Sequence, residues 1–68
     1  MAERLANRLK DRRTELGLTQ AELAEKVGVT RKTVNTVENG VFTPSATLAI
    51  KLARALRLRV EELFWIED

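Results

Sequence analysis

The sequence predicts an all-α fold, a compact bundle of five short helices, in one domain that spans residues 1–68. Three observations predict this fold. Apolar residues recur at three- and four-residue spacing, hydroxyl residues precede the predicted helices, and glycines follow several of them. A chain of this size buries only about 60% of the surface that its unfolded form exposes, so a deep catalytic cleft would remove core that it needs. The size therefore favours a binding module over an enzyme.

The first predicted helix covers residues 3–16. Leu5, Leu9 and Leu16 fall on one face at helical spacing, and Gly17 follows as a residue that can end a helix with positive φ. Arg12 falls on the same stripe. We expect its aliphatic stem to lie along the edge of the core, with the guanidinium in water.

The second and third predicted helices are short and closely joined. Thr19 and Glu22 have the spacing of a capping box, which starts a helix at residue 20. Gly28 ends it after about two turns, and Thr30 caps a helix that begins at residue 31. Two helices joined by so short a turn cross steeply, which predicts a helix-turn-helix.

The last two predicted helices complete the bundle. Asn39 and Gly40 end the third helix, and Ser45 has the position of an N-cap for the fourth. A final helical turn is expected at residues 60–64. The apolar stripe of the fourth helix consists of Leu48, Leu52, Ala55 and Leu56.

A helical projection separates two sides of the third helix. Val34, Val37 and Glu38 project inward, whereas Lys32, Thr36 and Asn39 project outward, with Arg31 and Asn35 flanking the outward side. A helix with these polar groups has a suitable diameter to enter the major groove of DNA. The alternative is that this is the polar face that any amphipathic helix shows to water.

Charge and composition exclude several classes of function. Residues 26–60 carry seven basic side chains and one acidic side chain, whereas residues 61–68 carry four acidic ones. The basic stretch favours a polyanionic partner, although a solvated helix surface remains an alternative. The chain has no Cys and no His, which excludes disulfides, thiol and imidazole catalysis and the usual zinc ligands. We therefore expect no enzyme activity, no cofactor and no metal.

Nothing in the sequence predicts a membrane span. The longest apolar run is Leu63 to Ile66, and the first ten residues, MAERLANRLK, are too charged for a signal peptide. We therefore expect a cytoplasmic protein.

The segments LGLTQAELAEKVGVTRKTVNTVENG, PSATLAIKLARAL and VEELF together resemble the phage repressor and Cro family of helix-turn-helix regulators, also called XRE-type regulators. The resemblance runs from about Leu5 to Phe64 and is closest to short single-domain bacterial and archaeal members. It implies a lambda-repressor-like domain that binds double-stranded DNA in a sequence-specific manner. It further implies a transcriptional repressor that acts as a homodimer on an inverted-repeat operator. No small-molecule ligand is evident from the sequence, and we expect none.

The same resemblance assigns residues to phosphate contacts. Gln20 matches a glutamine that binds a DNA phosphate at the amino terminus of the second helix, where free N–H groups favour an anion. The alternative is that Gln20 is an ordinary exposed residue next to a capping box. The full set implied by the resemblance is Thr19, Gln20, Thr33, Asn39, Gly40, Phe42 and Thr43, the last three through a loop that offers backbone N–H groups.

The resemblance places base reading on Arg31, Lys32, Asn35 and Thr36. Arg and Lys favour guanine, Asn pairs with adenine, and a Thr methyl packs on the methyl of thymine, so a half-site with at least one guanine is expected. The alternative for Arg31 or Lys32 is a phosphate contact.

Arg13 and Glu38 match family positions that form a partly buried ion pair between the first and third helices. The helical projection independently places Glu38 on the inward side, where a charge needs a partner. The alternative is a pair of unrelated surface charges.

The carboxyl end, about residues 63–68, is predicted to form a dimer interface through Phe64, Trp65 and Ile66. Such a tail acts in close relatives through its side chains or as a short paired strand. The alternative is that Trp65 folds back on the core of its own chain. A second function is also open: an antitoxin or other partner-binding protein that binds its own operator and holds a partner with this acidic, aromatic tail.

Overall fold

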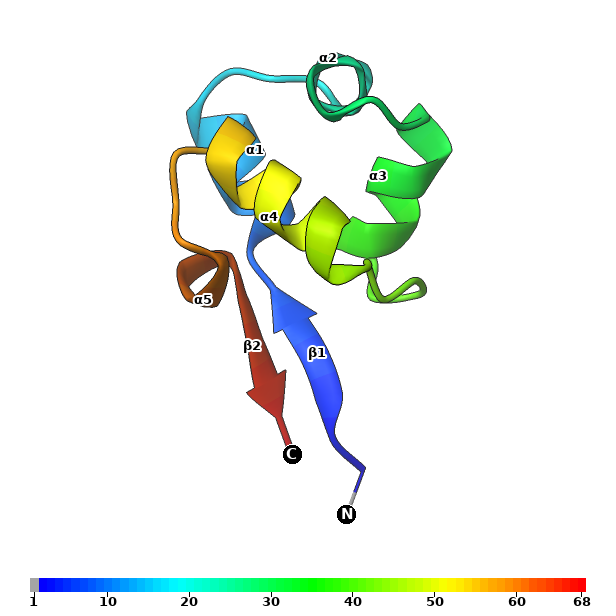
Figure 1. Ribbon diagram of the computed structural model, residues 1–68, viewed down its shortest axis with the longest axis vertical. Helices are drawn as coiled ribbons and strands as arrows, with labels where there is room; N and C mark the ends of the chain where they lie inside the picture. Colours follow the sequence, from blue (N-terminus) through cyan, green and yellow to red (C-terminus); the bar gives the residue numbers. More distant parts are fainter. Residues whose placement is uncertain (1) are drawn as a thin grey trace.

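The computed structural model describes residues 2–68 (Figure 1). Five helices gather at one end of the molecule, and a two-stranded ribbon extends from them toward both chain termini. The prediction of a helical bundle is confirmed, and the ribbon is an addition to it. The elements are β1 Arg4–Asn7, α1 Leu9–Glu15, α2 Gln20–Val27, α3 Arg31–Glu38, α4 Ala46–Ala55, α5 Val60–Leu63 and β2 Phe64–Glu67.

Side-chain caps set the starts of α2, α3 and α4, as the sequence predicts. The Thr19 hydroxyl accepts a hydrogen bond from the Glu22 N–H, and the Glu22 carboxylate accepts one from the Thr19 N–H. Thr30 and Ser45 accept in the same way at the starts of α3 and α4. Gly28 ends α2 with φ of 77°, a conformation that costs little only for glycine. The predicted helix-turn-helix is therefore confirmed.

The ribbon corrects the prediction for the amino terminus. Residues 4–7 were expected in a helix covering residues 3–16, but they form β1, which pairs antiparallel with β2. Leu5 lies opposite Ile66, and Asn7 lies opposite Phe64. Leu5 packs against the core from a strand, as it would also do from a helix. Its spacing from Leu9 therefore cannot distinguish a helix from a strand at this position. The pairing itself depends on residues about sixty positions away.

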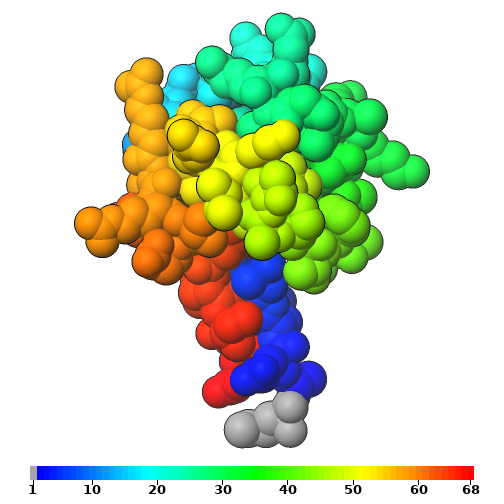
Figure 2. Space-filling view, viewed as in Figure 1, coloured from blue at the N-terminus to red at the C-terminus, as the bar shows by residue number. Residues whose placement is uncertain are grey.

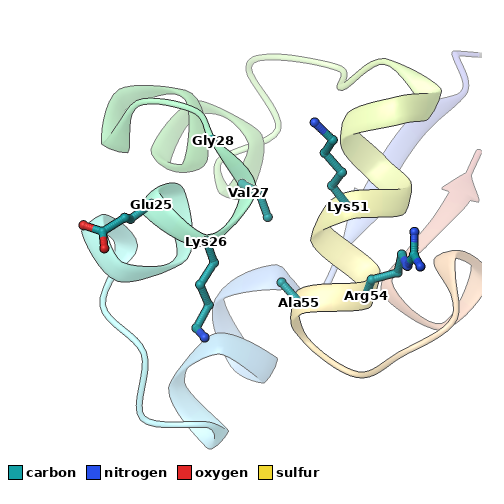
Figure 3. Close-up of a pocket in the computed structure, with 7 residues that line it drawn as sticks. All are labelled: Glu25, Lys26, Val27, Gly28, Lys51, Arg54 and Ala55. Atoms are coloured by element: carbon teal, nitrogen blue, oxygen red, sulfur yellow. The ribbon is translucent and has the colours of Figure 1, made fainter.

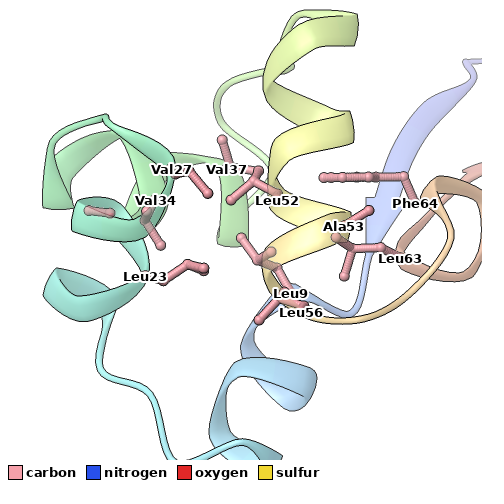
Figure 4. Close-up of a cluster of buried hydrophobic side chains, with 11 residues drawn as sticks. Leu9, Leu23, Val27, Val34, Val37, Leu52, Ala53, Leu56, Leu63 and Phe64 are labelled. Atoms are coloured by element: carbon pink, nitrogen blue, oxygen red, sulfur yellow. The ribbon is translucent and has the colours of Figure 1, made fainter.

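The hydrophobic core lies between the helices and the base of the ribbon (Figure 4). All five helices and β2 contribute to it. Its largest fully buried side chains are Leu9, Leu23, Val34, Val37, Leu52, Leu56 and Leu63.

At the edge of the core, the expectation that the Arg12 guanidinium lies in water is corrected. The Arg12 Nε donates to the Leu56 carbonyl at 2.9 Å. The guanidinium thus binds the end of α4 and is not simply hydrated.

The predicted interface residues separate into two groups. Phe64 is only 6% exposed and points toward α4, so it belongs to the core of its own chain and cannot meet a partner (Figure 4). This part of the prediction is wrong, because Phe64 lies at the base of the ribbon, directly after α5, where it packs into the core, whereas Ile66 on the same face of β2 lies farther from the helices. Trp65 is 40% exposed and Ile66 is 60% exposed. Both lie on the ribbon, which projects as a narrow extension below the helices (Figure 2).

Among residues 2–68, none of the helices has the length and hydrophobicity that a bilayer-spanning helix needs.

Candidate nucleic-acid interface

The recognition candidate, α3, is fixed by its apolar side. Val34 and Val37 are each 1% exposed, so the opposite side of the helix faces solvent. Arg31, Lys32 and Asn35 are exposed there. Neither Arg31 nor Lys32 forms an ion pair within residues 2–68. Both cations are therefore available to an external anion or acceptor.

Thr36 is less accessible than its predicted outward position suggests. It is half-buried, and its hydroxyl donates to the Thr33 carbonyl at 3.0 Å within the same helix. The donor of the hydroxyl is thereby used internally. Its methyl group is the part that could contact a base.

A shallow hollow brings together residues from both helices of the motif. It is lined by Gln20 of α2 and by Arg31, Lys32 and Asn35 of α3. The hollow thus joins the predicted phosphate-binding glutamine to three of the four predicted base-reading residues. The Asn35 Oδ1 accepts from the Asn39 Nδ2 at 3.2 Å, which leaves the Asn35 amide N–H groups as donors toward the hollow.

A network of hydrogen bonds lies behind this hollow. The Arg13 Nε donates to the Glu38 Oε2 at 2.6 Å, and the Arg13 Nη2 donates to Oε1 at 3.3 Å. The two side chains are only 12% and 4% exposed. Arg13 also donates to the Leu18 carbonyl at 2.8 Å. The structure thus places the two residues in the arrangement that the family resemblance implies, and it locks the last turn of α3 to α1.

Gln20 belongs to the same network, which sequence reasoning missed. Its Nε2 donates to the Glu38 Oε1 at 3.1 Å. An amide nitrogen carries two N–H groups, so one remains for an external acceptor. The inward position of Glu38, together with a helix start at Gln20, is the signal that could have suggested the contact.

The other phosphate candidates differ in what they can offer. Thr19 caps α2, and Thr33 shares a 3.0 Å hydrogen bond with Thr30 at the start of α3. In the loop after α3, the Gly40 N–H donates to the Val37 carbonyl, and the Phe42 N–H donates to the Thr36 carbonyl. The expectation that these two N–H groups bind phosphate is therefore wrong, because both already donate hydrogen bonds within the turn. Within residues 2–68 the Thr43 N–H makes no hydrogen bond.

One acidic group of the motif has a shifted pKa. The backbone N–H of Thr19, and then its hydroxyl, lower the pKa of Glu22 below its ordinary value. In the ribbon, hydrogen bonds from Arg4 and then Trp65 lower the pKa of Glu67. Residues 2–68 contain no group of three or more acidic side chains that could hold a metal ion.

A second hollow lies between the carboxyl end of α2 and α4 (Figure 3). Lys51 and Arg54 project from α4 at its rim, and Lys26 projects from α2. This hollow shares no residue with the one beside α3. It is a basic surface on a different part of the molecule. Because Lys51 is an exposed lysine outside the hollow of α3, its substitution is a matched control for substitution of Lys32.

Comparison with known proteins defines the family. A helix-turn-helix family model matches residues 9–63, which span α1 to α5. The chain belongs to the XRE-type helix-turn-helix family of DNA-binding transcriptional regulators.

Three similar proteins illustrate the range of similarity. The chain is 41% identical over 64 residues to the transcriptional regulator YgzD of Bacillus subtilis. The aligned residues cover 94% of this chain and 97% of YgzD. It is 37% identical over 54 residues to the antitoxin HipB of Escherichia coli, covering 79% of this chain and 61% of HipB. The P22 c2 repressor, solved with a synthetic operator, matches with a TM-score of 0.77 and 28% identity over 79% of this chain and 82% of the repressor.

Proposed function

We propose that this chain reads a specific sequence of double-stranded DNA with the outward side of α3 and represses transcription as a cytoplasmic homodimer on an inverted repeat. The observation that carries the proposal is the hollow in which Gln20 of α2 meets Arg31, Lys32 and Asn35 of α3. Binding alone, with no catalytic step, is enough for this function. The P22 c2 repressor, with its operator, supports it by similarity.

Base reading rests on the unpaired cations of α3. Arg31 and Lys32 are exposed at the first turn, where side chains of a recognition helix reach base edges. Both can donate to the O6 and N7 of guanine, and Asn35 can donate to the N7 of adenine. To accept from the N6 of that adenine, Asn35 would use the second lone pair of its Oδ1. The methyl of Thr36 is the fourth contact, toward thymine.

Phosphate binding rests on Gln20 and on the start of α2. Glu38 holds one N–H of the Gln20 amide, which limits the rotation of the side chain and directs the other N–H outward. Because Arg13 holds Glu38 in turn, three helices fix the direction of this donor. A donor fixed before binding loses less conformational entropy when it meets a phosphate. Gln20 is therefore proposed to add affinity for any DNA sequence.

The dimer is proposed to form through the ribbon. Trp65 and Ile66 are large apolar side chains exposed in a projecting element, and such surface favours a partner. Two copies related by a two-fold axis would present two α3 helices to major grooves about 34 Å apart. Phe64 takes no part, since it lies in the core.

Selection from randomised duplex DNA tests the function, using the purified chain at two salt concentrations. We expect enrichment of an inverted repeat that contains guanine, with half-sites near one helical turn apart. Binding that is weak, lost at higher salt and without an enriched sequence would contradict sequence reading.

Sedimentation of Ile66→Lys tests the dimer. We expect the variant to be monomeric at concentrations at which the wild-type chain is dimeric. Val41→Lys is the matched control, because Val41 is 78% exposed but lies in the loop after α3. A dimer that survives Ile66→Lys, or that Val41→Lys breaks equally, would contradict the assignment to the ribbon.

The similarity to HipB favours a second candidate, an antitoxin or other partner-binding protein. In that case Trp65, Ile66 and the acidic Glu67 would meet a different protein. Co-purification of one defined partner by the wild-type chain, lost in Ile66→Lys while operator binding stays intact, would favour this candidate over the homodimer.

A further inference from the structure

We propose that Asn7 is a positioning residue for DNA binding, through which the ribbon holds the last turn of α3 in place. The inference rests on the proposed function, because it assigns α3 to DNA recognition. It adds a residue outside the helix-turn-helix that sets how α3 is presented.

Asn7 joins three segments that are far apart in the sequence. Its Nδ2 donates to the Val37 carbonyl of α3 at 3.0 Å, and its Oδ1 accepts from the Leu9 N–H of α1 at 3.0 Å. Its backbone pairs with Phe64 in the ribbon. One side chain therefore connects the ribbon, the first turn of α1 and the last turn of α3.

The carbonyl that Asn7 binds lies in the last turn of α3. The last carbonyls of a helix have no intrahelical N–H, so an outside donor fixes them more than it fixes the middle of a helix. The Gly40 N–H also donates to the Val37 carbonyl, at 3.1 Å, so Asn7 holds the loop after α3 at the same point. The contact is partly buried, and water therefore replaces it poorly.

The last turn of α3 is thus held from two directions. Arg13 and Gln20 bind the Glu38 carboxylate from the side of α1 and α2. Asn7 binds the neighbouring Val37 carbonyl from the side of the ribbon. Loss of either hold lets the end of α3 move relative to the other helices, and a shift of the ribbon passes directly to α3.

A purely structural alternative is that Asn7 only supports the entry into α1, because its Oδ1 accepts from the Leu9 N–H two residues on, beside Arg8, the N-cap residue, which makes no side-chain cap hydrogen bond. Serine separates the two roles, because its hydroxyl can accept from the Leu9 N–H but is too short to reach the Val37 carbonyl as well. A Ser hydroxyl forms the same kind of local hydrogen bond to a backbone N–H two residues on, although more weakly than Asn. Asn7→Ser therefore retains a contact with Leu9, removes the link to α3 and leaves the charge unchanged.

The test compares wild type, Asn7→Ser and, as a matched control in β1, Ala6→Ser. Each is measured for affinity to a duplex selected by the wild type, at a temperature at which all are folded, and by amide NMR spectra without DNA. We expect Asn7→Ser to lose roughly fivefold or more in affinity, as befits one lost hydrogen bond. We also expect amide shifts at residues 37–40, and neither change in Ala6→Ser.

Wild-type affinity for Asn7→Ser, or unchanged amide signals at residues 37–40, would overturn the inference and leave Asn7 with a role at the start of α1 only. If the serine variant fails to fold, Asn7→Asp, which keeps the acceptor for the Leu9 N–H, replaces it in the amide spectra alone, because its added negative charge weakens DNA binding by itself. Failure of the wild type to select any sequence would instead count against the proposed function. The spectra need no DNA, so they decide the link between Asn7 and α3 even then.

Discussion

The helix-turn-helix and the ribbon are held together over very different distances along the chain. Each helix of the motif starts at a cap whose partner lies three residues away, such as Thr19 with Glu22. The ribbon joins residues 4–7 to residues 64–67. The first kind of contact forms wherever the local sequence allows it, whereas the second needs the bundle to bring both ends together. The helix-turn-helix can therefore be predicted from local sequence patterns, whereas the ribbon cannot.

The same contrast holds for the ion pairs of the two regions. Arg13 and Glu38 are nearly buried behind the motif, whereas Arg4 and Glu67, at 2.8 Å on the ribbon, are 77% and 41% exposed. A buried charge without its partner is costly, whereas water readily replaces an exposed one. Four substitutions, each with its own measurement, test how much the contacts of the ribbon and of the helix-turn-helix contribute to stability.

The largest effect is expected where the ribbon enters the core. Phe64→Ala should lower the free energy of unfolding by about 3 to 5 kcal/mol, because it leaves a cavity under α4. Urea denaturation measures this. Trp65→Ala, one residue along the same strand but 40% exposed, should cost less than half as much. Equal losses would mean that both faces of the ribbon are anchored alike.

Next in size is the ion pair behind the motif. Glu38→Ala should lower the free energy of unfolding by about 3 kcal/mol, because the buried Arg13 loses its partner. It should also weaken DNA binding, since Gln20 loses the acceptor that orients it. Glu67→Ala serves as the ribbon counterpart and should change stability little. A similar loss in both variants would remove the distinction between the two pairs.

A smaller effect tests the local contacts of the motif. Thr19→Ala should cost about 1 kcal/mol, because it removes the cap of α2. Thermal unfolding followed by circular dichroism measures the change. Thr14→Ala is the control, because Thr14 is exposed and its side chain makes no hydrogen bond within residues 2–68. If the control loses as much as Thr19→Ala, the start of α2 does not depend on its cap.

The smallest effect concerns pH. Hydrogen bonds from Thr19 lower the pKa of Glu22 in the folded chain, so the unfolded chain binds more protons in that range and stability rises with pH. This contribution is present above about pH 4.3, the ordinary value for glutamate, and is lost as the pH falls through the lower folded value. Glu22→Gln keeps a capping residue without a titrating group, so its stability should change less between neutral pH and acid. An unchanged pH dependence would show that the capping carboxylate contributes nothing.

Much of the helical bundle follows from patterns within a few residues. Thr19, Thr30 and Ser45 each mark a helix start that the structure contains. The projection of α3 places Val34 and Val37 inside and Lys32 outside, because a helix of eight residues keeps a regular period. The meeting of Gln20 with the outward side of α3 follows from the short turn between the two helices.

The remaining features depend on contacts that no local pattern reports. Leu5 and Leu9 have a spacing that suits a helix, and only the pairing with Ile66 makes Leu5 part of a strand. Phe64 is predicted at an interface because it lies near the chain end, yet it packs into the core because it is the first residue of β2, directly after α5. The links from Asn7 to α3 and from Gln20 to Glu38 join residues thirty and eighteen positions apart.

The most direct test of sequence reading by α3 compares two lysines. Lys32→Ala and Lys51→Ala remove the same charge from two exposed sites, one beside the hollow of α3 and one on α4 (Figure 3). Affinity is measured for a selected duplex and for a random duplex of equal length. We expect Lys32→Ala to lower the ratio of the two affinities by a factor of roughly 5 to 150, which corresponds to a loss of about 1 to 3 kcal/mol, and Lys51→Ala to leave it unchanged. An unchanged ratio in Lys32→Ala, or equal effects of the two substitutions, would contradict the assignment of base reading to α3.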